Sequence, residues 1–118
     1  MDQLLKKAAV MLNKKPSKPI KRLIAGLDYL DAKDHQLIIK AFVYASIAHE
    51  TQSRETGEPY IHHPLAVAQT LAELRLDKES IAAALLHDVL EDTALNNDFI
   101  SQEFGKEILS LVDGVSKL

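Results

Sequence analysis

Apolar residues recur through most of this 118-residue chain at the three- and four-residue spacing of amphipathic helices. The first such stripe runs from Leu4 to Leu12 and stops before Pro16, and the second runs from Ile20 to Leu30. Asp31 can cap a third helix, which we expect to continue to about Thr51. No stretch alternates β-branched and polar residues with the period of two that a half-buried strand requires.

The helical pattern breaks between Gln52 and His63, where Gly57, Pro59 and several charged residues predict a loop. Helical spacing then returns and continues to the end of the chain. We expect one helix to begin at Pro64, and another to follow a cap at Asp77 and cover about residues 78–90. A further helix should begin at Asn96 or Asn97, and Gly105 should end it or bend it into a last helix. The predicted fold class is therefore all-α.

The composition is that of a globular protein, with 47% hydrophobic and 26% charged residues. Cysteine is absent, which excludes disulfides, thiolate zinc sites and cysteine nucleophiles. The longest unbroken apolar run, Ile81 to Leu86, is far too short to cross a bilayer. These features predict a cytoplasmic domain without a membrane span.

Charge is unevenly distributed along the chain. Residues 1–40 hold nine Lys and Arg against four Asp and Glu, whereas residues 41–118 hold five against thirteen. The basic part could touch a phosphate backbone, but no aromatic or Gly-rich element accompanies its lysines, which favours a solvated helix surface. Nucleic acid is thus an improbable partner, and the acidic part suits a divalent cation if its carboxylates converge.

Without thiolates, a metal site in this chain has to use imidazole and carboxylate ligands. His87 and Asp88 follow the most apolar segment, and on a continuous helix they would face Glu91 and Asp92 respectively. Carboxylates at the C-terminal end of a helix face its negative pole, and a bound cation would reverse that penalty. An exposed, frayed last turn without metal is the alternative that this spacing leaves open.

His63, which precedes Pro64 at an expected helix start, supplies a third candidate ligand beside His87 and Asp88. Two imidazoles and one carboxylate suit Mn, Fe or a similar ion better than a structural zinc. The other histidines, for which packing or surface roles are expected, are His35, His49 and His62. In the loop, Arg54 could bind a phosphate with two hydrogen bonds, although a loop arginine is more often simply solvated.

Several separated motifs, taken in order, resemble the hydrolase domain of RelA/SpoT homologues. The matching residues are Ala48–Glu50, Gln52, Arg54, Gly57–Ile61, His63–Pro64, Ala83–Val89, Glu91–Thr93, Phe104–Gly105 and Leu111–Leu118. The resemblance covers about residues 40–118, and residues 1–39 agree only as generic helices. It implies an HD-domain helical bundle. Helices within residues 1–39 would pack on the HD core, and residues 40–118 would form the N-terminal part of that core.

The resemblance also implies an activity, the degradation of the stringent-response alarmones. Such domains hydrolyse the 3′-pyrophosphate of guanosine tetra- and pentaphosphate to GDP or GTP plus pyrophosphate, usually with Mn²⁺. By motif position, His63, His87 and Asp88 would bind the metal, and Glu91 and Asp92 would orient or deprotonate the attacking water. The intact His-Asp and Glu-Asp pairs favour a hydrolytic lineage.

The same resemblance assigns Arg54, Glu55 and Thr56 to nucleotide binding. Many family members have a basic residue directly after the loop arginine, and Glu55 departs from that pattern. The family completes its metal site with an Asp downstream of the segment that ends here at Leu118, a position that Asp113 does not take. We therefore expect a longer protein with synthetase and regulatory domains beyond this chain.

Two other functions remain open at this stage. The chain could be another nucleotide phosphohydrolase of the HD superfamily. It could instead be a catalytically incompetent helical fragment with a binding or regulatory role. Because helices without their packing partners expose apolar surface, we also expect the isolated chain to self-associate.

Overall fold

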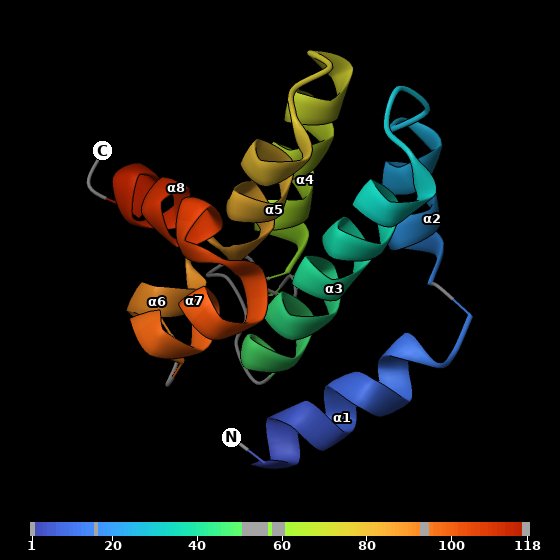
Figure 1. The fold of residues 1–118 in the computed structure, drawn as a ribbon. Helices are drawn as coiled ribbons and strands as arrows, with labels where there is room; N and C mark the ends of the chain where they lie inside the picture. Colours follow the sequence, from blue (N-terminus) through green and yellow to red (C-terminus); the bar gives the residue numbers. More distant parts are fainter. Residues whose placement is uncertain (1, 16, 51–56, 58–60, 93–94, 117–118) are drawn as a thin grey trace.

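The computed structural model describes residues 2–15, 17–50, 57, 61–92 and 95–116. Over these residues the chain forms helices and no strand, which confirms the all-α prediction (Figure 1). The helices are α1 (Asp2–Leu12), α2 (Lys18–Ala25), α3 (Ala32–Ala48), α4 (His62–Glu73), α5 (Lys78–Leu86), α6 (Val89–Asp92), α7 (Asn97–Phe104) and α8 (Lys106–Ser116). In the described part, none of them is long and apolar enough to span a membrane.

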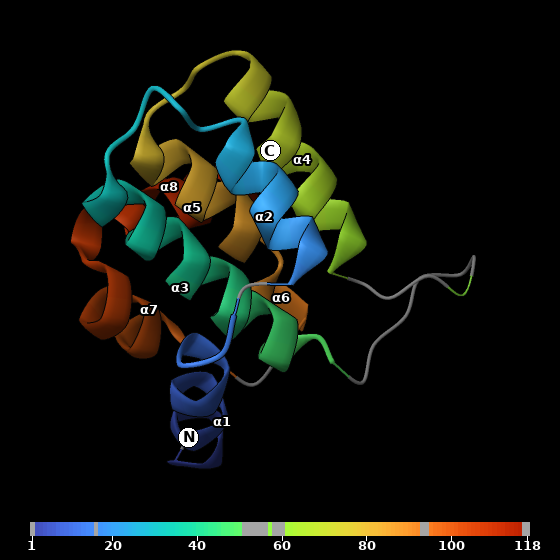
Figure 2. The ribbon, with the colours of Figure 1, turned by 90° about the vertical axis from the view of Figure 1, so that its right-hand side faces the viewer.

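Helix α3 is the central element and packs against α1, α2 and α5. It begins as expected, because the Asp31 carboxylate accepts a hydrogen bond of 2.8 Å from the Asp34 N–H and satisfies one of the first free amides. Helix α5 also contacts α4 and α8, so that α3, α4 and α8 all pack against it. Both views place α1 at one end of the molecule, away from α4 (Figures 1 and 2).

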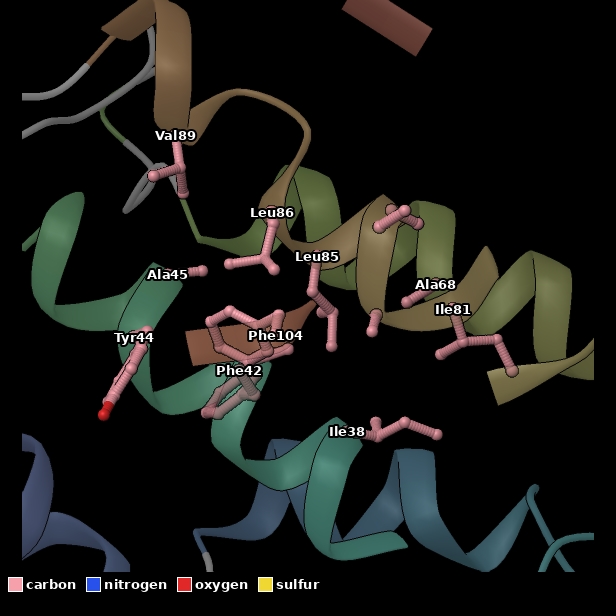
Figure 3. Close-up of a cluster of buried hydrophobic side chains, with 14 of the residues drawn as sticks. Ile38, Phe42, Tyr44, Ala45, Ala68, Ile81, Leu85, Leu86, Val89 and Phe104 are labelled. Carbon is pink, nitrogen blue, oxygen red and sulfur yellow. The ribbon is translucent and has the colours of Figure 1, made fainter. Parts of the chain in front are cut away.

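The core is built around α5, whose six consecutive residues from Ile81 to Leu86 are all buried. A helix that is covered on every side has no polar face, and this explains why its sequence shows no amphipathic stripe. Figure 3 shows Leu85 and Leu86 directed toward Phe42 and Ala45 of α3. Burying one such aliphatic side chain stabilises the fold by about 1.5–3 kcal/mol, so α5 contributes strongly to stability.

Several predicted helix limits were wrong by a few residues. Helix α2 ends at Ala25 rather than near Leu30, with Gly26 as its C-cap, although Leu27 is still fully buried. Helix α3 ends at Ala48, before the predicted limit. Helix α4 begins two residues before Pro64, which is tolerated because the first four amides of a helix have no partner within it.

The last two helices follow the predicted signals closely. The Asn96 side chain caps α7 by accepting a hydrogen bond of 2.9 Å from the Phe99 N–H. Gly105 ends α7 with a φ of 94°, a backbone conformation that a residue with a Cβ rarely adopts. The glycine therefore allows the direct turn from α7 into α8.

The expected division between residues 1–39 and 40–118 falls inside α3, which is one continuous helix. Ile38 and Ala41, on either side of that point, are both buried in the same core cluster. Ala8 of α1 belongs to that cluster as well. The chain thus has no structural break at residue 40, and the limits of the HD part stay a prediction.

Candidate metal centre

Three candidate ligands come from two neighbouring helices. His63 lies in the first turn of α4, and His87 and Asp88 follow the last residue of α5. Helices α4 and α5 pack against each other and are joined by the short linker 74–77. In such a helical hairpin the second helix returns toward the beginning of the first, so the start of α4 lies beside the end of α5.

The side chains of His63, His87 and Asp88 converge, as expected. Their potential ligand atoms lie within 4.8 Å of one another. The Nε2 atom of His87 is 3.2 Å from the Oδ2 atom of Asp88, and the His63 and His87 ring centroids are 5.7 Å apart. The His87 and Asp88 side chains are only 14% and 15% exposed.

This donor set fits a single divalent cation. Bonds from such an ion to imidazole nitrogen and carboxylate oxygen are about 2.1 Å long, so small rotations of these side chains would bring their ligand atoms onto one ion. The C-terminal pole of α5 adds negative potential beside His87 and Asp88, which favours a cation. That these residues bind a metal stays a prediction, which the geometry supports.

A hydrogen bond outside the ligand cluster holds the His87 ring. Its Nδ1 atom lies 2.6 Å from the main-chain oxygen of Ala84, one turn earlier in α5. Sequence reasoning missed this contact, because a main-chain carbonyl leaves no signature in the residue type. The only available hint was the position of a histidine directly after a helix, where its ring can reach the last carbonyls.

The prediction of one helix over residues 78–90 was wrong at the point that matters most for the site. Helix α5 ends at Leu86, a turn at His87 and Asp88 follows, and α6 begins at Val89. Val89 is fully buried and belongs to the same core cluster as Leu86 and Ala45, which Figure 3 shows. The turn at residues 87–88 thus interrupts the helix while Leu86 before it and Val89 after it both stay buried in the core.

Because of this turn, residues 87 and 88 are not in one continuous helix with residues 91 and 92, and the i, i+4 relation expected from the sequence does not apply. The main chain of Glu91 and Asp92 lies in α6, directly after the candidate ligands. Their side chains lie outside the described part of the structure, and their catalytic role stays a prediction. Arg54, Glu55 and Thr56 lie outside the described residues altogether.

The remaining histidines fit their expected packing or surface roles. His62 is exposed, His49 is buried, and the partly buried His35 places Nε2 2.7 Å from the main-chain oxygen of Leu27. The group of candidate ligands found among the described residues does not include Asp113.

An apolar cavity of about 330 Å³ adjoins His87 between α4, α5 and α8. Its walls are formed by Val67, Leu71, Leu76, Ser80, Ala83, Ala84, His87 and Leu111. The sequence analysis did not predict it, although Val67 and Leu71 have the i, i+4 spacing of one helix face. One side of the candidate centre is consequently hydrophobic.

Comparisons of the sequence with known proteins identify a family. The HD domain family matches residues 41–118. The chain is 50% identical over 91 residues to a guanosine-3′,5′-bis(diphosphate) 3′-pyrophosphohydrolase of Vibrio cholerae, which is 77% of this chain and 13% of that protein. It is 51% identical over 90 residues, 76% of this chain and 13% of the relative, to the bifunctional (p)ppGpp synthase/hydrolase SpoT of Escherichia coli.

A GTP pyrophosphokinase of Myxococcus xanthus is 49% identical over 85 residues, 72% of this chain and 11% of that protein. These matches confirm the resemblance to RelA/SpoT proteins. The chain spans little more than a tenth of the length of these curated relatives. A match of 91 residues is also longer than segment 41–118, so the similarity extends upstream of residue 41.

Proposed function

The chain belongs to the HD domain family, and from that membership we propose that it takes part in metal-dependent hydrolysis of the 3′-pyrophosphate of guanosine tetra- and pentaphosphate. The products would be GDP or GTP and pyrophosphate. The convergence of His63, His87 and Asp88 within 4.8 Å carries the proposal. The names of relatives about 50% identical to the chain support the choice of substrate.

In this proposal His63, His87 and Asp88 hold the divalent ion, and the mixture of imidazole and carboxylate ligands favours Mn²⁺. A divalent ion at this position would lower the pKa of a water molecule and offset the charge of the phosphate oxygens. Phosphoryl transfer depends mainly on positioning and charge stabilisation, so the chain needs no nucleophilic side chain.

Glu91 and Asp92 would orient the attacking water and accept its proton, since α6 begins directly after Asp88. Arg54 would bind the polyphosphate, with Thr56 beside it. Glu55 adds a negative charge next to Arg54, and we propose that it weakens nucleotide binding relative to a family member with a basic residue there.

We extend the proposal to the surroundings of the chain. A guanosine nucleotide substrate is consistent with a place in the cytoplasm. Synthetase and regulatory domains would accompany the chain, and the name of the Escherichia coli relative, a synthase/hydrolase, supports the synthetase. The apolar cavity beside His87 and the exposed Leu74 favour self-association of the isolated chain.

The test is a hydrolysis assay with guanosine tetraphosphate and Mn²⁺, applied to this chain and to a version extended by about 80 residues of natural sequence. We expect the unsubstituted protein to release pyrophosphate and GDP. The H63Q variant should lose this activity, and the H62Q variant should keep it. His62 is the matched control, because it neighbours His63 in α4 and is exposed.

Each alternative predicts a different outcome. Cleavage of 5′-nucleotides in preference to the 3′-pyrophosphate would indicate another HD-superfamily phosphohydrolase. Activity of the extended version alone would indicate that this chain is a structural part of the enzyme. Absence of hydrolysis in both would refute the proposal and favour a binding or regulatory role.

A further inference from the structure

We propose that the groove between α1 and α3 is a docking site for a partner protein that presents an acidic amphipathic helix. The groove has a volume of about 390 Å³ and shares no residue with the group of candidate metal ligands. The proposal therefore does not depend on the hydrolase activity proposed above. It rests on the apolar walls of the groove, on the way α1 is held and on the surrounding charge.

The walls of the groove are largely apolar and come from α1, α3 and the first turn of α2. Met11 and Leu12, in the last turn of α1, are 38% and 37% exposed, whereas Phe42 and Val43 of α3 are buried. An apolar patch that is rimmed by polar residues is typical of an interaction site. The flexible methionine side chain also adapts to the shape of a partner. The apolar residues that line the groove are Met11, Leu12, Ile20, Ile39, Phe42 and Val43.

Contacts on one side of the groove hold α1 beside α3 (Figures 1 and 2). Ala8 of α1 is 1% exposed and belongs to the core cluster. Lys7 donates a hydrogen bond of 2.7 Å from Nζ to the carboxylate of Glu50, which follows the end of α3. Met11 lies one turn after Lys7 in α1. The groove is therefore formed before any partner binds, which lowers the cost of docking.

The chain segment that borders the groove is basic. Residues 3–27 contain seven Lys and Arg and no Asp or Glu, whereas residues 28–118 contain seven Lys and Arg against sixteen Asp and Glu. All seven basic side chains of the first segment are exposed. Lys14 and Lys15 line the groove, and neither forms an ion pair with a described residue. A negatively charged partner is complementary to this surface.

Apolar walls beside two lysines favour an acidic amphipathic helix as the partner. In helix-in-groove recognition, apolar side chains at i, i+3, i+4 and i+7 enter the groove and the polar face stays outside. The volume of about 390 Å³ lies near the lower end of the range of binding pockets, about 300–1,000 Å³, and suits a few anchoring side chains. Carboxylates next to these anchors would meet Lys14 and Lys15.

Nucleic acid and a membrane surface fit this groove less well. Single-stranded nucleic acid binds in basic grooves by stacking its bases on aromatic rings, and the aromatic residue that lines this groove, Phe42, is only 8% exposed. An amphipathic helix binds a bilayer through its apolar face. In α1 that face carries Ala8, which is buried in the core of the protein.

Fluorescence anisotropy of a labelled synthetic peptide, added to the whole chain, tests the proposal. The probe is a helix with leucine at i, i+3, i+4 and i+7 and glutamate at most other positions. We expect it to bind, and we expect about tenfold weaker binding when lysine replaces the glutamates or alanine replaces the leucines. Equal binding of these peptides would overturn the proposal, and so would absence of binding at millimolar concentrations of the acidic probe.

Substitutions in the groove locate the binding site. K14E/K15E reverses the two lysines, and M11Q makes the wall polar at nearly constant size; each should weaken binding of the acidic probe about tenfold. Circular dichroism verifies that both variants keep their helix content. A loss of helix in M11Q leaves the test to K14E/K15E, whose side chains are exposed.

Matched controls separate the groove from general effects of charge and polarity. K33E/K106E makes the same change in net charge at exposed lysines in the first turns of α3 and α8. L74Q makes an exposed leucine outside the groove polar. Both controls should bind the acidic probe as the natural chain does. An equal loss of binding in the controls would contradict a site in this groove.

Amide chemical shifts of the ¹⁵N-labelled chain show where the peptide lies. The largest changes on addition of the acidic probe should fall on Met11, Leu12 and residues 39–43. Changes centred on α4, α5 and α8 would contradict the proposal. Phosphatidylglycerol vesicles and a short single-stranded RNA are the competing ligands. Tighter binding of either one than of the peptide, abolished in K14E/K15E, would assign the lysines to a membrane or to nucleic acid and overturn the proposal.

Discussion

Lys40 of α3 lies against Glu103 of α7, with its Nζ atom 2.8 Å from the Glu103 main-chain oxygen and 3.5 Å from the carboxylate. The same ammonium group is 5.1 Å from the centre of the Phe104 ring. Tyr44, one turn further along α3, donates a hydrogen bond of 2.9 Å to the Glu103 carboxylate. These contacts attach α7 to the central helix, and α8, which packs on α7, also packs on α5.

Tyr44 should make stability depend on alkaline pH. Burial, the hydrogen bond to Glu103 and the charge of that carboxylate raise the pKa of Tyr44 to about 12. The folded state therefore favours the protonated phenol, so this contribution is complete below the ordinary pKa of 10 and is lost as the pH rises toward 12.

Y44F removes both the titrating group and the donor to Glu103. We expect a loss of about 1–3 kcal/mol of unfolding free energy near neutral pH, because a partly buried carboxylate loses a hydrogen bond. Urea unfolding at several pH values should show the two proteins becoming more alike between pH 10 and 12. A difference that stays constant over this range would contradict the assigned pKa.

The candidate metal centre should bind a divalent ion even when no substrate is hydrolysed. This binding can be measured as an increase in the stability of the folded chain. A ligand that binds only the folded state at 100 times its dissociation constant adds about 2.7 kcal/mol of stability. Mn²⁺ should therefore raise the melting temperature of the natural chain and of H62Q, but not that of H63Q. Equal stabilisation of H62Q and H63Q would mean that the ion binds elsewhere.

Leu85 should be among the most sensitive core positions, because its side chain is fully buried between α5 and α3. L85A is expected to lose about 2–5 kcal/mol of unfolding free energy, through the lost burial and the cavity left behind. L74A is the matched control, since Leu74 is 65% exposed, and it should change stability by no more than about 0.5 kcal/mol. Chemical denaturation of both variants measures the contrast.

Self-association of the isolated chain should depend on concentration and on apolar surface. Leu74 and Leu76 are exposed, and Leu76 also forms part of the cavity beside His87. Light scattering over a range of concentrations should show an increasing mass for the natural chain and a smaller increase for L74D. A monodisperse monomer at high concentration would contradict this prediction.

Local sequence signals predicted those parts of the fold that local interactions determine. Asp31 and Asn96 cap their helices, and Gly105 ends α7, because each acts within three or four residues of its own position. The meeting of His63 with His87 and Asp88 was also predictable, since one short helical hairpin separates them and the motif order resembled a known family.

The missed features depend on packing between distant segments. The end of α5 at Leu86 could not be predicted, because a helix buried on all sides lacks the amphipathic period that marks helix limits. The attachment of Lys40 and Tyr44 to Glu103 joins residues about sixty positions apart, and no local pattern encodes such a pair. The cavity beside His87 likewise depends on how α8 crosses α4 and α5.

Helices α4 and α5 are joined by covalent chain at linker 74–77, and the other end of this hairpin carries the three candidate ligands. An ion held there would convert the segment from His63 to His87 into a closed ring. Because the ion binds only the folded arrangement of these ligands, opening either helix would cost its binding free energy. Metal loading should therefore slow amide exchange throughout both helices, and chelation should loosen them together.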